Sequence, residues 1–389
     1  MAVDAPIELH LPGDLIIGGG TSQALAEHVT RIGVTRPLVV SDAFLLEEGP
    51  AGPLVERLEG AGLEVAVFGD VQPDPTLDNV RGAVDALRAH EADGVVAIGG
   101  GSPMDTAKAA AVALANEGDV RDYAGYHRVP GPGLPLVAVP TTAGTGSEVT
   151  RVAVITDTER DVKMMMLDGH LMARVAISDY ELTLSTPPAL TSWVGVDSLT
   201  HAIEAYVSSR ATVLTDMFAL EAARLIGAHL RRAVRTPDDA AAREAMMLGA
   251  TLAGAAFSNA SVALVHGMSR PIGAHFHLAH GLSNALLLPA VTRFSVAGAP
   301  ARYATVARTM GLAGDEDADA TACERLVEEL EALNRDLEIP SLAGAEVDRD
   351  HFERVVAEMA QAALDSGSPD FNPQPASKEE IIELYRQAY

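Results

Sequence analysis

The sequence predicts an α/β domain built on a parallel, Rossmann-like sheet, followed by an all-α domain. The chain has 389 residues, a length that suits two hydrophobic cores of ordinary size. Short β-branched runs alternate with helical patterns through the first half. After Pro187 and Pro188 this alternation ends, and the sequence shows long alanine- and leucine-rich segments with helical periodicity. The predicted domains are therefore 1–187 and 188–389.

The strands of the first domain are expected where apolar runs end in turn residues. Helical segments such as LDNVRGAVDALRAH separate these runs, and a strand that alternates with helices in this way belongs to βαβ units and a parallel sheet. The loops expected around them include GPGLP at 131–135 and, in the second half, GSPDFNPQP at 367–375. The predicted strands are PLVVSD (37–42), LEVAVFGD (63–70), GVVAIGGG (94–101), PLVAVPTT (135–142) and VAVITD (152–157).

The composition excludes several kinds of partner. The formal net charge is −26, spread along the chain, and such a surface repels nucleic acid and anionic membranes. No apolar run reaches membrane-spanning length and the start MAVDAPIELHLPGD lacks the features of a signal peptide, so a cytoplasmic protein is expected. Cys323 is the single cysteine, so any metal must be held by histidine, aspartate or glutamate.

Two glycine-containing turns follow neighbouring predicted strands. GGGSPMDTAK (99–108) lies between a strand and a helical run, where backbone N–H groups and a helix N-terminus can receive a phosphate. It lacks the GxGxxG pattern, and by itself it fits a plain tight turn equally well. PTTAGTGSEVT (140–150) repeats the arrangement with four hydroxyl side chains before Glu148. The two turns together predict a dinucleotide site at the carboxyl edge of the sheet.

Asp42 ends the first predicted strand, PLVVSD. A carboxylate in this place can hold the adenosine ribose diol and repels a 2′-phosphate, which favours NAD(H) over NADP(H). Its alternative role is that of a helix N-cap.

A third group of residues has the chemistry of a metal site. Asp197 and His201 are four apart in a helical context and project from one face, although an ordinary polar pair has the same spacing. His266 and His280 flank Pro271 and Gly273, which predict a break that lets a returning segment bring both imidazoles together; either histidine alone also fits a satisfied core position. One carboxylate and three imidazoles suit Fe(II) or Zn(II), with a position left for a substrate oxygen.

Four motifs closely resemble those of the iron-containing (group III) alcohol dehydrogenases, and the resemblance runs over nearly the whole chain. They are GGGSPMDTAK, PTTAGTGSEVT, GVDSLTHAIEAY and FSNASVALVHGMSRPIGAHFHLAHG. The resemblance implies a dehydroquinate synthase-like architecture, a dinucleotide-binding domain, a helical metal-binding domain, an active site in the cleft between them, and a homodimer. It implies an oxidoreductase that interconverts a small alcohol and its aldehyde with NAD(H). The implied metal ligands are Asp197, His201, His266 and His280, and the implied cofactor contacts are Asp42, Gly100, Gly101, Ser102, Asp105, Thr141, Thr142, Thr145 and Lys163.

Two arginines depart from the pattern of the family. Arg270 stands where many relatives have a histidine, and Arg151 follows the second turn where several diol-acting relatives have an apolar residue. If both point inward, they form a clamp for an anionic tail, as in phosphonoacetaldehyde. Alternatively Arg270 pairs with Glu148 or contacts cofactor phosphates. His277 is a candidate proton relay, with a surface role as its alternative.

Three further functions remain open from the sequence. One is a general small-alcohol, lactaldehyde or 1,2-diol dehydrogenase. Another is a lyase or synthase on the related dehydroquinate synthase and glycerol dehydrogenase architecture, which would regenerate its cofactor rather than consume it. The last is a non-catalytic binding protein, against which the full set of ligands and both turns argue.

Overall fold

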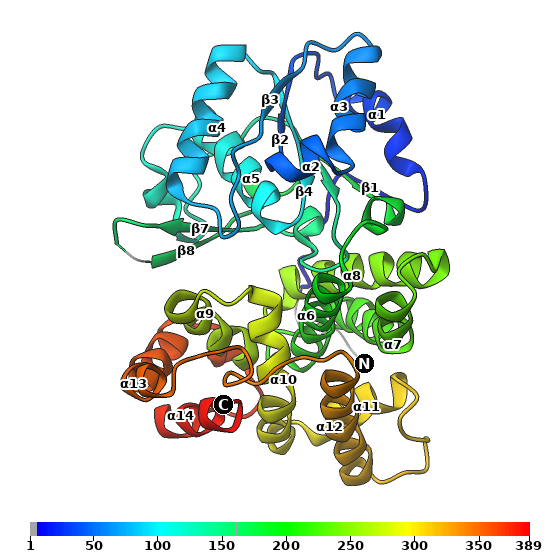
Figure 1. Ribbon diagram of the computed structural model, residues 1–389, viewed down its shortest axis with the longest axis vertical. Helices are drawn as coiled ribbons and strands as arrows, with labels where there is room; N and C mark the ends of the chain where they lie inside the picture. The colour runs from blue at the N-terminus through cyan, green and yellow to red at the C-terminus, as the bar shows by residue number, and fades with distance from the viewer. Residues whose placement is uncertain (1–5, 161) are drawn as a thin grey trace. The chain divides into compact units, whose positions relative to one another are not determined.

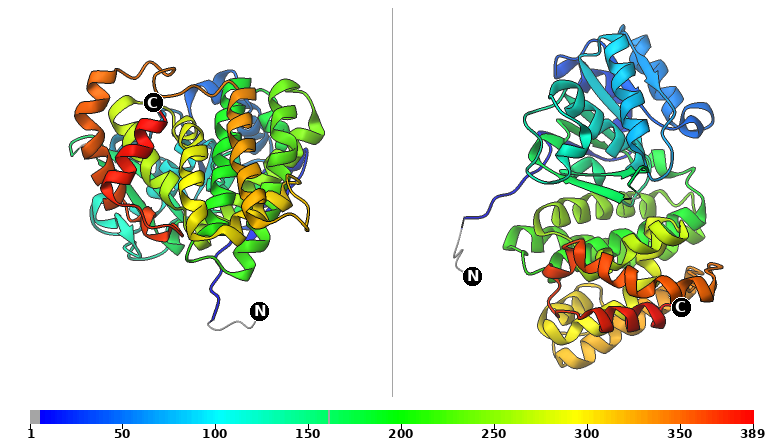
Figure 2. Two further views of the ribbon diagram at one scale, coloured as in Figure 1. Left: turned by 90° about the horizontal axis from the view of Figure 1, so that it is seen from below. Right: turned by 90° about the vertical axis from the view of Figure 1, so that its left-hand side faces the viewer.

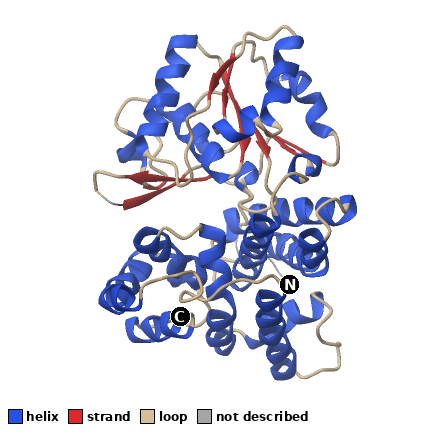
Figure 3. Ribbon diagram, viewed as in Figure 1, coloured by secondary structure: helices blue, strands red, loops and turns tan. Residues whose placement is uncertain are grey.

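The computed structural model describes residues 6–160 and 162–389, and the chain divides into two compact units. The sheet unit comprises Leu9–Ser185, and the helical unit comprises Thr186–Tyr389 together with the described residues 6–8. Figure 3 shows the strands gathered in the first unit, and Figure 2 shows the green-to-red helices of the second packed side by side. The predicted fold class, a parallel sheet with helices followed by an all-α part, is confirmed.

In the described part of the sheet unit, the larger sheet has six strands, all paired in parallel. Their order across the sheet is β1 (Asp14–Ile17), β9 (Val175–Ser178), β6 (Leu136–Pro140), β4 (Gly94–Gly99), β2 (Pro37–Val40) and β3 (Ala66–Phe68). The sequence analysis did not predict β1 or β9, the two strands at one edge of this sheet.

One predicted strand lies in a second sheet. VAVITD forms β7 (Val152–Asp157), which pairs antiparallel with β8 (Val162–Leu167), and β8 also pairs in parallel with β5 (Gly125–Tyr126). The burial pattern of β7 alternates, as it does in a hairpin covered on one face, whereas the central strands β2, β4 and β6 are buried at every position. The sequence analysis did not separate β7 from the parallel strands, because all of these segments are short and largely apolar.

Both faces of the larger sheet are covered by helices (Figure 1). Side chains alternate along β2: Leu38 and Val40 join the core that includes α4 (Leu77–His90) and α5 (Gly101–Ala115). Val39 joins the opposite core. That second core is completed by α1 (Leu25–Arg31) and α3 (Ala51–Gly60), while α2 (Ala43–Glu47) follows β2 directly.

The helical unit is organised around α6 (Pro188–Val207), which packs against α7, α8 and α10. Gly195 lets α6 and α7 approach closely, because it has no Cβ. A Cβ added at this position would lie 2.3 Å from the side chain of Leu230 on α7. Among the described residues no single helix is long and apolar enough to cross a membrane. The remaining helices are α7 (Val213–Arg235), α8 (Ala240–Ala260), α9 (Leu264–Phe276), α10 (His280–Ser295), α11 (Pro300–Thr309), α12 (Asp319–Asp336), α13 (Arg349–Asp365) and α14 (Lys378–Gln387).

Candidate metal centre and cofactor turns

The two predicted cofactor turns lie side by side at the carboxyl edge of the larger sheet. Strands β4 and β6 are neighbours whose last residues, Gly99 and Pro140, are paired in register. The backbone N–H of Thr141 donates to the carbonyl of Gly99 at 3.0 Å. Parallel strands end at a common edge, so turns that are about forty residues apart in sequence form one surface.

The glycines of the first turn are required by close packing. Gly99 has φ +152°, and a Cβ there would lie 2.6 Å from the ring of Pro103. A Cβ on Gly101 would lie 3.2 Å from the side chain of Thr145 in the second turn. Helix α5 begins at Gly101, and Gly100 caps it without a side chain. The first N–H groups of this helix therefore suit a pyrophosphate, which is the group a dinucleotide would present.

A buried lysine holds the second turn against α5. Lys108 is 1% exposed. Its ammonium donates to the carbonyl oxygens of Ser147, Thr150 and Val152 at 2.7, 2.9 and 2.9 Å. The hydroxyls of Ser147 and Thr150 accept at 2.9 and 3.1 Å. Burial lowers the pKa of Lys108 to about 8, against the opposing attraction of Asp105 and Glu148.

Asp105 is engaged in the same packing. One carboxylate oxygen accepts the hydroxyl of Ser147 at 2.9 Å, and the other accepts the backbone N–H of Val154 at 2.9 Å. Burial raises the pKa of Asp105, although Lys108 and these hydrogen bonds oppose the shift. Asp105 thus joins the turn to β7, and a contact between Asp105 and a cofactor stays a prediction.

Two other predicted cofactor residues have partners within the sheet unit. Asp42 is the N-cap of α2, because its carboxylate accepts the N–H of Leu45 at 2.9 Å. That bond occupies one of its two oxygens, so the cap and a ribose contact are compatible. Lys163 lies on β8 and forms an ion pair with Asp74 at 2.7 Å, with its side chain 21% exposed. The remaining predicted contacts, which lie within or next to the two turns, are Gly100, Ser102, Thr141, Thr142 and Thr145.

The four predicted metal ligands come together inside the helical unit. Asp197 and His201 lie one turn apart on α6, His266 lies in the first turn of α9, and His280 is the first residue of α10. One ligand atom from each of the four lies within 4.8 Å of the others. Oδ1 of Asp197 is 3.8, 3.6 and 3.9 Å from the Nε2 atoms of His201, His266 and His280.

This donor set fits a divalent transition metal. Ligand atoms placed about 2.1 Å from one ion in a tetrahedral arrangement are about 3.4 Å apart, only slightly less than the distances from Asp197. The carboxylate and the imidazoles of His201 and His266 are buried, and His280 is the exposed member. A partly open site with nitrogen and oxygen ligands is the arrangement that leaves room for a substrate atom.

The electrostatics of the cluster favour positive charge. Burial would raise the pKa of Asp197, but the surrounding imidazoles lower it well below the usual range. Burial would likewise lower the pKa of His266, but the carboxylates of Asp197 and Glu204 raise it to about 9. In both cases the attraction between carboxylate and imidazole groups outweighs desolvation. The carboxylates therefore favour positive charge beside them, and a cation bound among these groups would be stabilised.

The sequence reading did not find two residues of this centre. Nδ2 of Asn284 lies 2.6 Å from Oδ1 of Asp197, and 3.1 and 3.2 Å from Nε2 of His266 and His280. Glu204 accepts a hydrogen bond from Nδ1 of His266 at 2.7 Å. Sequence spacing could have indicated both residues, because each lies about one helical turn after a predicted ligand. Glu204 is three residues after His201, and Asn284 is four residues after His280.

The chain turns at a different place from the one predicted. Pro271 lies inside α9, and the helix continues to Phe276. The turn comes at His277, which is the C-cap with φ 55° and ψ 27° in the left-handed region. A proline removes one N–H donor, and this loss is tolerated inside a packed helix more readily than its sequence signal suggests. His277 is exposed in this position, and a role in proton transfer stays a prediction.

The two arginines lie in different units. Arg151 is 8% exposed and directly follows the second turn of the sheet unit. Arg270 lies on α9 of the helical unit, one turn after His266, and is partly buried. Each is therefore next to one of the two predicted binding regions.

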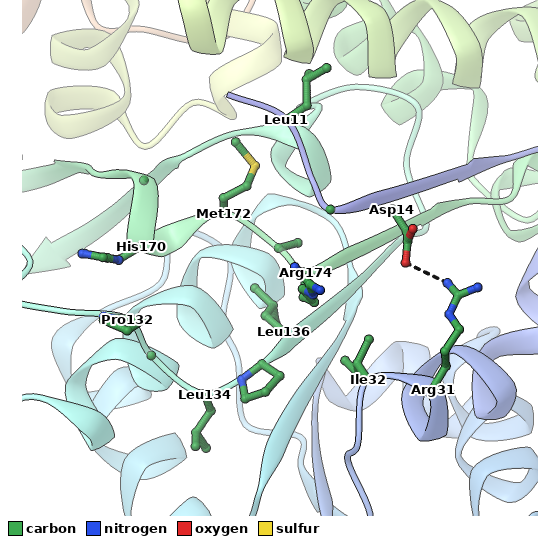
Figure 4. Close-up of a pocket in the computed structure, with 15 residues that line it drawn as sticks. Leu11, Asp14, Arg31, Ile32, Pro132, Leu134, Leu136, His170, Met172 and Arg174 are labelled. Atoms are coloured by element: carbon green, nitrogen blue, oxygen red, sulfur yellow. Dashed lines mark hydrogen bonds and ion pairs between the residues drawn. The ribbon is translucent and has the colours of Figure 1, made fainter. Parts of the chain in front are cut away.

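A groove of about 860 Å³ lies at the amino edge of the larger sheet, and Figure 4 shows its lining. Asp14 and Leu136 are the first residues of β1 and β6. Asp14 forms an ion pair with Arg31 at 2.8 Å. None of the predicted site residues lines this groove, because the cofactor turns lie at the opposite, carboxyl ends of the strands.

A parallel sheet with two glycine-containing turns at its carboxyl edge, together with a helical unit that carries a histidine–carboxylate cluster, is typical of dehydrogenases that use a metal and a dinucleotide. Family models agree with this class. The model described as iron-containing alcohol dehydrogenase matches residues 12–180, and that of the C-terminal part of the same family matches residues 191–389. The chain belongs to the iron-containing alcohol dehydrogenase family, whose members are alcohol and aldehyde oxidoreductases.

Individual proteins cover the chain almost completely. It is 38% identical to the NAD-dependent methanol dehydrogenase of Bacillus methanolicus over 97% of this chain and 98% of that one. The crystal structure of a 1,3-propanediol oxidoreductase matches with TM-score 0.96 and 36% identity, over 99% and 100% of the two chains. A sulfoacetaldehyde reductase from Bifidobacterium kashiwanohense, solved with NAD+, matches with TM-score 0.87 and 27% identity over 99% of each chain.

Proposed function

We propose that the protein is an iron-dependent, NAD(H)-linked alcohol dehydrogenase that interconverts a small primary alcohol and its aldehyde, on a substrate with an anionic tail. The observation that carries the proposal is the convergence of Asp197, His201, His266 and His280 within 4.8 Å. A divalent cation held by these residues would supply a Lewis acid that polarises a carbonyl oxygen, or lowers the pKa of an alcohol in the reverse direction. Fe(II) is proposed because the family is iron-containing, and Zn(II) suits the same ligands.

The cofactor is proposed from the sheet unit. The N–H groups at the start of α5 and the hydroxyls of Thr141, Thr142 and Thr145 would hold the pyrophosphate and its neighbouring groups. The second oxygen of Asp42 would accept a ribose hydroxyl and repel the 2′-phosphate of NADP(H). Two relatives are described with NAD, which agrees with this choice. Lys163 would contact the nicotinamide ribose after leaving Asp74.

The anionic tail is proposed from Arg151 and Arg270. Each guanidinium can bind a carboxylate, phosphonate or sulfonate through two parallel hydrogen bonds. The similarity to a sulfoacetaldehyde reductase supports a charged substrate class, because sulfoacetaldehyde carries an anion two atoms from its carbonyl. Phosphonoacetaldehyde, which would give 2-hydroxyethylphosphonate, remains our specific candidate.

The test is NADH oxidation by chelator-treated protein reconstituted anaerobically with Fe(II). Phosphonoacetaldehyde, sulfoacetaldehyde and succinic semialdehyde are compared with propanal and lactaldehyde. We expect kcat/KM to favour the anionic aldehydes by about 100-fold, roughly what one desolvated charged contact supplies. Arg151→Leu and Arg270→Leu should each remove most of this preference while leaving the neutral aldehydes little changed. An unchanged preference in both variants would assign the two arginines to structure or to cofactor binding.

The second candidate is a general small-alcohol or diol dehydrogenase, which the similarity to a methanol dehydrogenase and a 1,3-propanediol oxidoreductase favours. Equal or faster turnover of propanal and lactaldehyde in the same assay would select it. Stoichiometric consumption of NADH separates either dehydrogenase from a lyase that regenerates its cofactor.

A homodimer and a cytoplasmic location stay predictions. Sedimentation equilibrium tests the dimer, and cell fractionation tests the location. For His277, a proton relay predicts that His277→Ala changes the pH profile of kcat and leaves metal binding unchanged.

A further inference from the structure

Glu204 lies on the same face of α6 as two of the metal ligands. It lies three residues after His201 and seven after Asp197. The three residues thus occupy positions i, i+4 and i+7, which recur on one stripe of a helix. Glu204 is 3% exposed, and it is not one of the four residues whose ligand atoms converge. A carboxylate is rarely buried to this extent unless it is hydrogen-bonded or paired.

Three donors from one short segment satisfy this carboxylate. Oε2 accepts the backbone N–H of Ala263 at 2.9 Å and Nδ1 of His266 at 2.7 Å. Oε1 accepts the backbone N–H of Val265 at 2.6 Å. An ionised carboxylate can accept all three hydrogen bonds, whereas an amide offers a single oxygen and adds two N–H donors.

The first consequence concerns the tautomer of His266. Because Nδ1 faces an acceptor, it must carry the proton, and the lone pair of a neutral imidazole is then on Nε2. Nε2 is the atom that faces the cluster, 3.6 Å from Oδ1 of Asp197. The contact with Glu204 therefore presents the correct nitrogen to a metal ion and increases its basicity.

The second consequence concerns the backbone that carries His266. Ala263 is the N-cap of α9 and has no capping side chain of its own, so Glu204 satisfies N–H groups of this helix start from another helix. Helices α8 and α9 meet here at an angle of 102°, and Ser261 between them has φ 72°. Glu204 thus fixes both the start of α9 and the imidazole in its first turn.

We propose that Glu204 is a positioning residue that sets the metal affinity of the site by holding His266 in its Nδ1-protonated form and by capping α9. The inference rests on the proposed metal site and deepens it. No part of it requires Glu204 to touch the ion or the substrate.

The test is a titration of chelator-treated full-length protein with Co(II), followed by visible absorption and by competition with a chelator of known affinity. Glu204→Gln retains the size of the side chain but removes acceptor capacity. We expect Co(II) binding to weaken by roughly 10–100-fold, the range observed when a group that orients a ligand is lost. The absorption bands of bound Co(II) should also shift, because the imidazole of His266 is no longer held in one orientation.

Ser208→Ala is the matched control. The hydroxyl of Ser208, which is also buried, donates to the carbonyl of Ala260 at 2.6 Å and so supports the same joint between α8 and the chain that follows. It makes no contact with His266 among the described hydrogen bonds. Ser208→Ala should lower resistance to urea while it leaves the Co(II) affinity and spectrum as in the parent protein.

Imidazole 15N NMR of the unmodified protein with bound Zn(II) provides a measurement that does not depend on the variant folding. We expect His266 to be protonated at Nδ1 and metal-bound through Nε2. Binding through Nδ1, or Co(II) affinity in folded Glu204→Gln equal to that of the parent, would overturn the inference alone. Failure of the parent protein to bind Co(II) or Zn(II) would overturn the proposed function as well.

Discussion

The cofactor turns and the metal cluster both bury carboxylates, but they neutralise them differently. In the sheet unit, Lys108 provides a cation of the chain's own beside Asp105 and Glu148, and its ammonium also lies within hydrogen-bond distance of five oxygen acceptors. In the helical unit, the described partners of Asp197 and Glu204 are histidines, an asparagine amide and backbone N–H groups.

The cofactor turns thus contain their own cation, whereas the metal cluster has the donor groups to accept an added one. A buried carboxylate costs several kcal/mol unless it is paired. The first region offsets that cost with Lys108, a cation that belongs to the chain, so its shape should depend little on what is bound. The second can meet it through protonated imidazoles or through a metal, and its affinity for metal should therefore be high.

The largest expected effect is the loss of a ligand from the cluster. In His201→Ala, kcat/KM for aldehyde reduction should fall by roughly three orders of magnitude, because several kcal/mol of charge stabilisation disappears with the bound cation. Metal content and NADH oxidation are measured together after reconstitution with Fe(II). His275→Ala on α9 is the control and should retain both. Full activity in His201→Ala would remove the cluster from the catalytic site.

The second largest effect is expected on stability, from the loss of the buried ammonium of Lys108. Lys108→Met should lower the free energy of unfolding by about 3–5 kcal/mol, because it leaves buried carboxylates and several acceptors without their partner. Urea unfolding followed by circular dichroism measures the loss. The affinity for Co(II) should remain that of the parent protein in the same variant. A loss below about 1 kcal/mol would show that this region is not stabilised by the lysine's charge.

The pH dependence of stability sharpens the same point. The pKa of Lys108 falls from 10.5 to about 8 on folding, because the site is buried. Between these two values the unfolded chain binds more protons than the folded one, so this group makes the free energy of unfolding rise with pH. The slope contributed is at most about 1.4 kcal/mol per pH unit. Urea midpoints between pH 7.5 and 10 should show this rise in the parent protein relative to Lys108→Met, and parallel curves would contradict it.

The smallest effect is expected for an exposed ion pair of the sheet unit. Lys163→Met removes the pair with Asp74, whose side chains are 21% and 52% exposed, and should change the free energy of unfolding by less than about 1 kcal/mol. If Lys163 contacts the nicotinamide ribose, the Kd for NADH should nevertheless rise several-fold, as fluorescence titration would measure. An unchanged Kd would leave Lys163 as a surface residue.

The sequence predicted the class of fold because its signals are local. Buried parallel strands appear as continuous apolar runs, and a helix that covers them shows its own period. The same signals misplaced particular elements. VAVITD was read as one more parallel strand, although it forms an antiparallel pair, and Pro271 was read as a break, although α9 continues through it.

For the candidate site, the sequence by itself determined the candidates for metal and dinucleotide binding, because suitable donor chemistry belongs to residue types and to short motifs. Only the tertiary structure decided how those groups are supported. Lys108 reaches residues about forty positions away, and Glu204 reaches a helix start about sixty positions away. Such pairings depend on which buried donors and acceptors meet after packing, and neither spacing nor periodicity in the sequence records that.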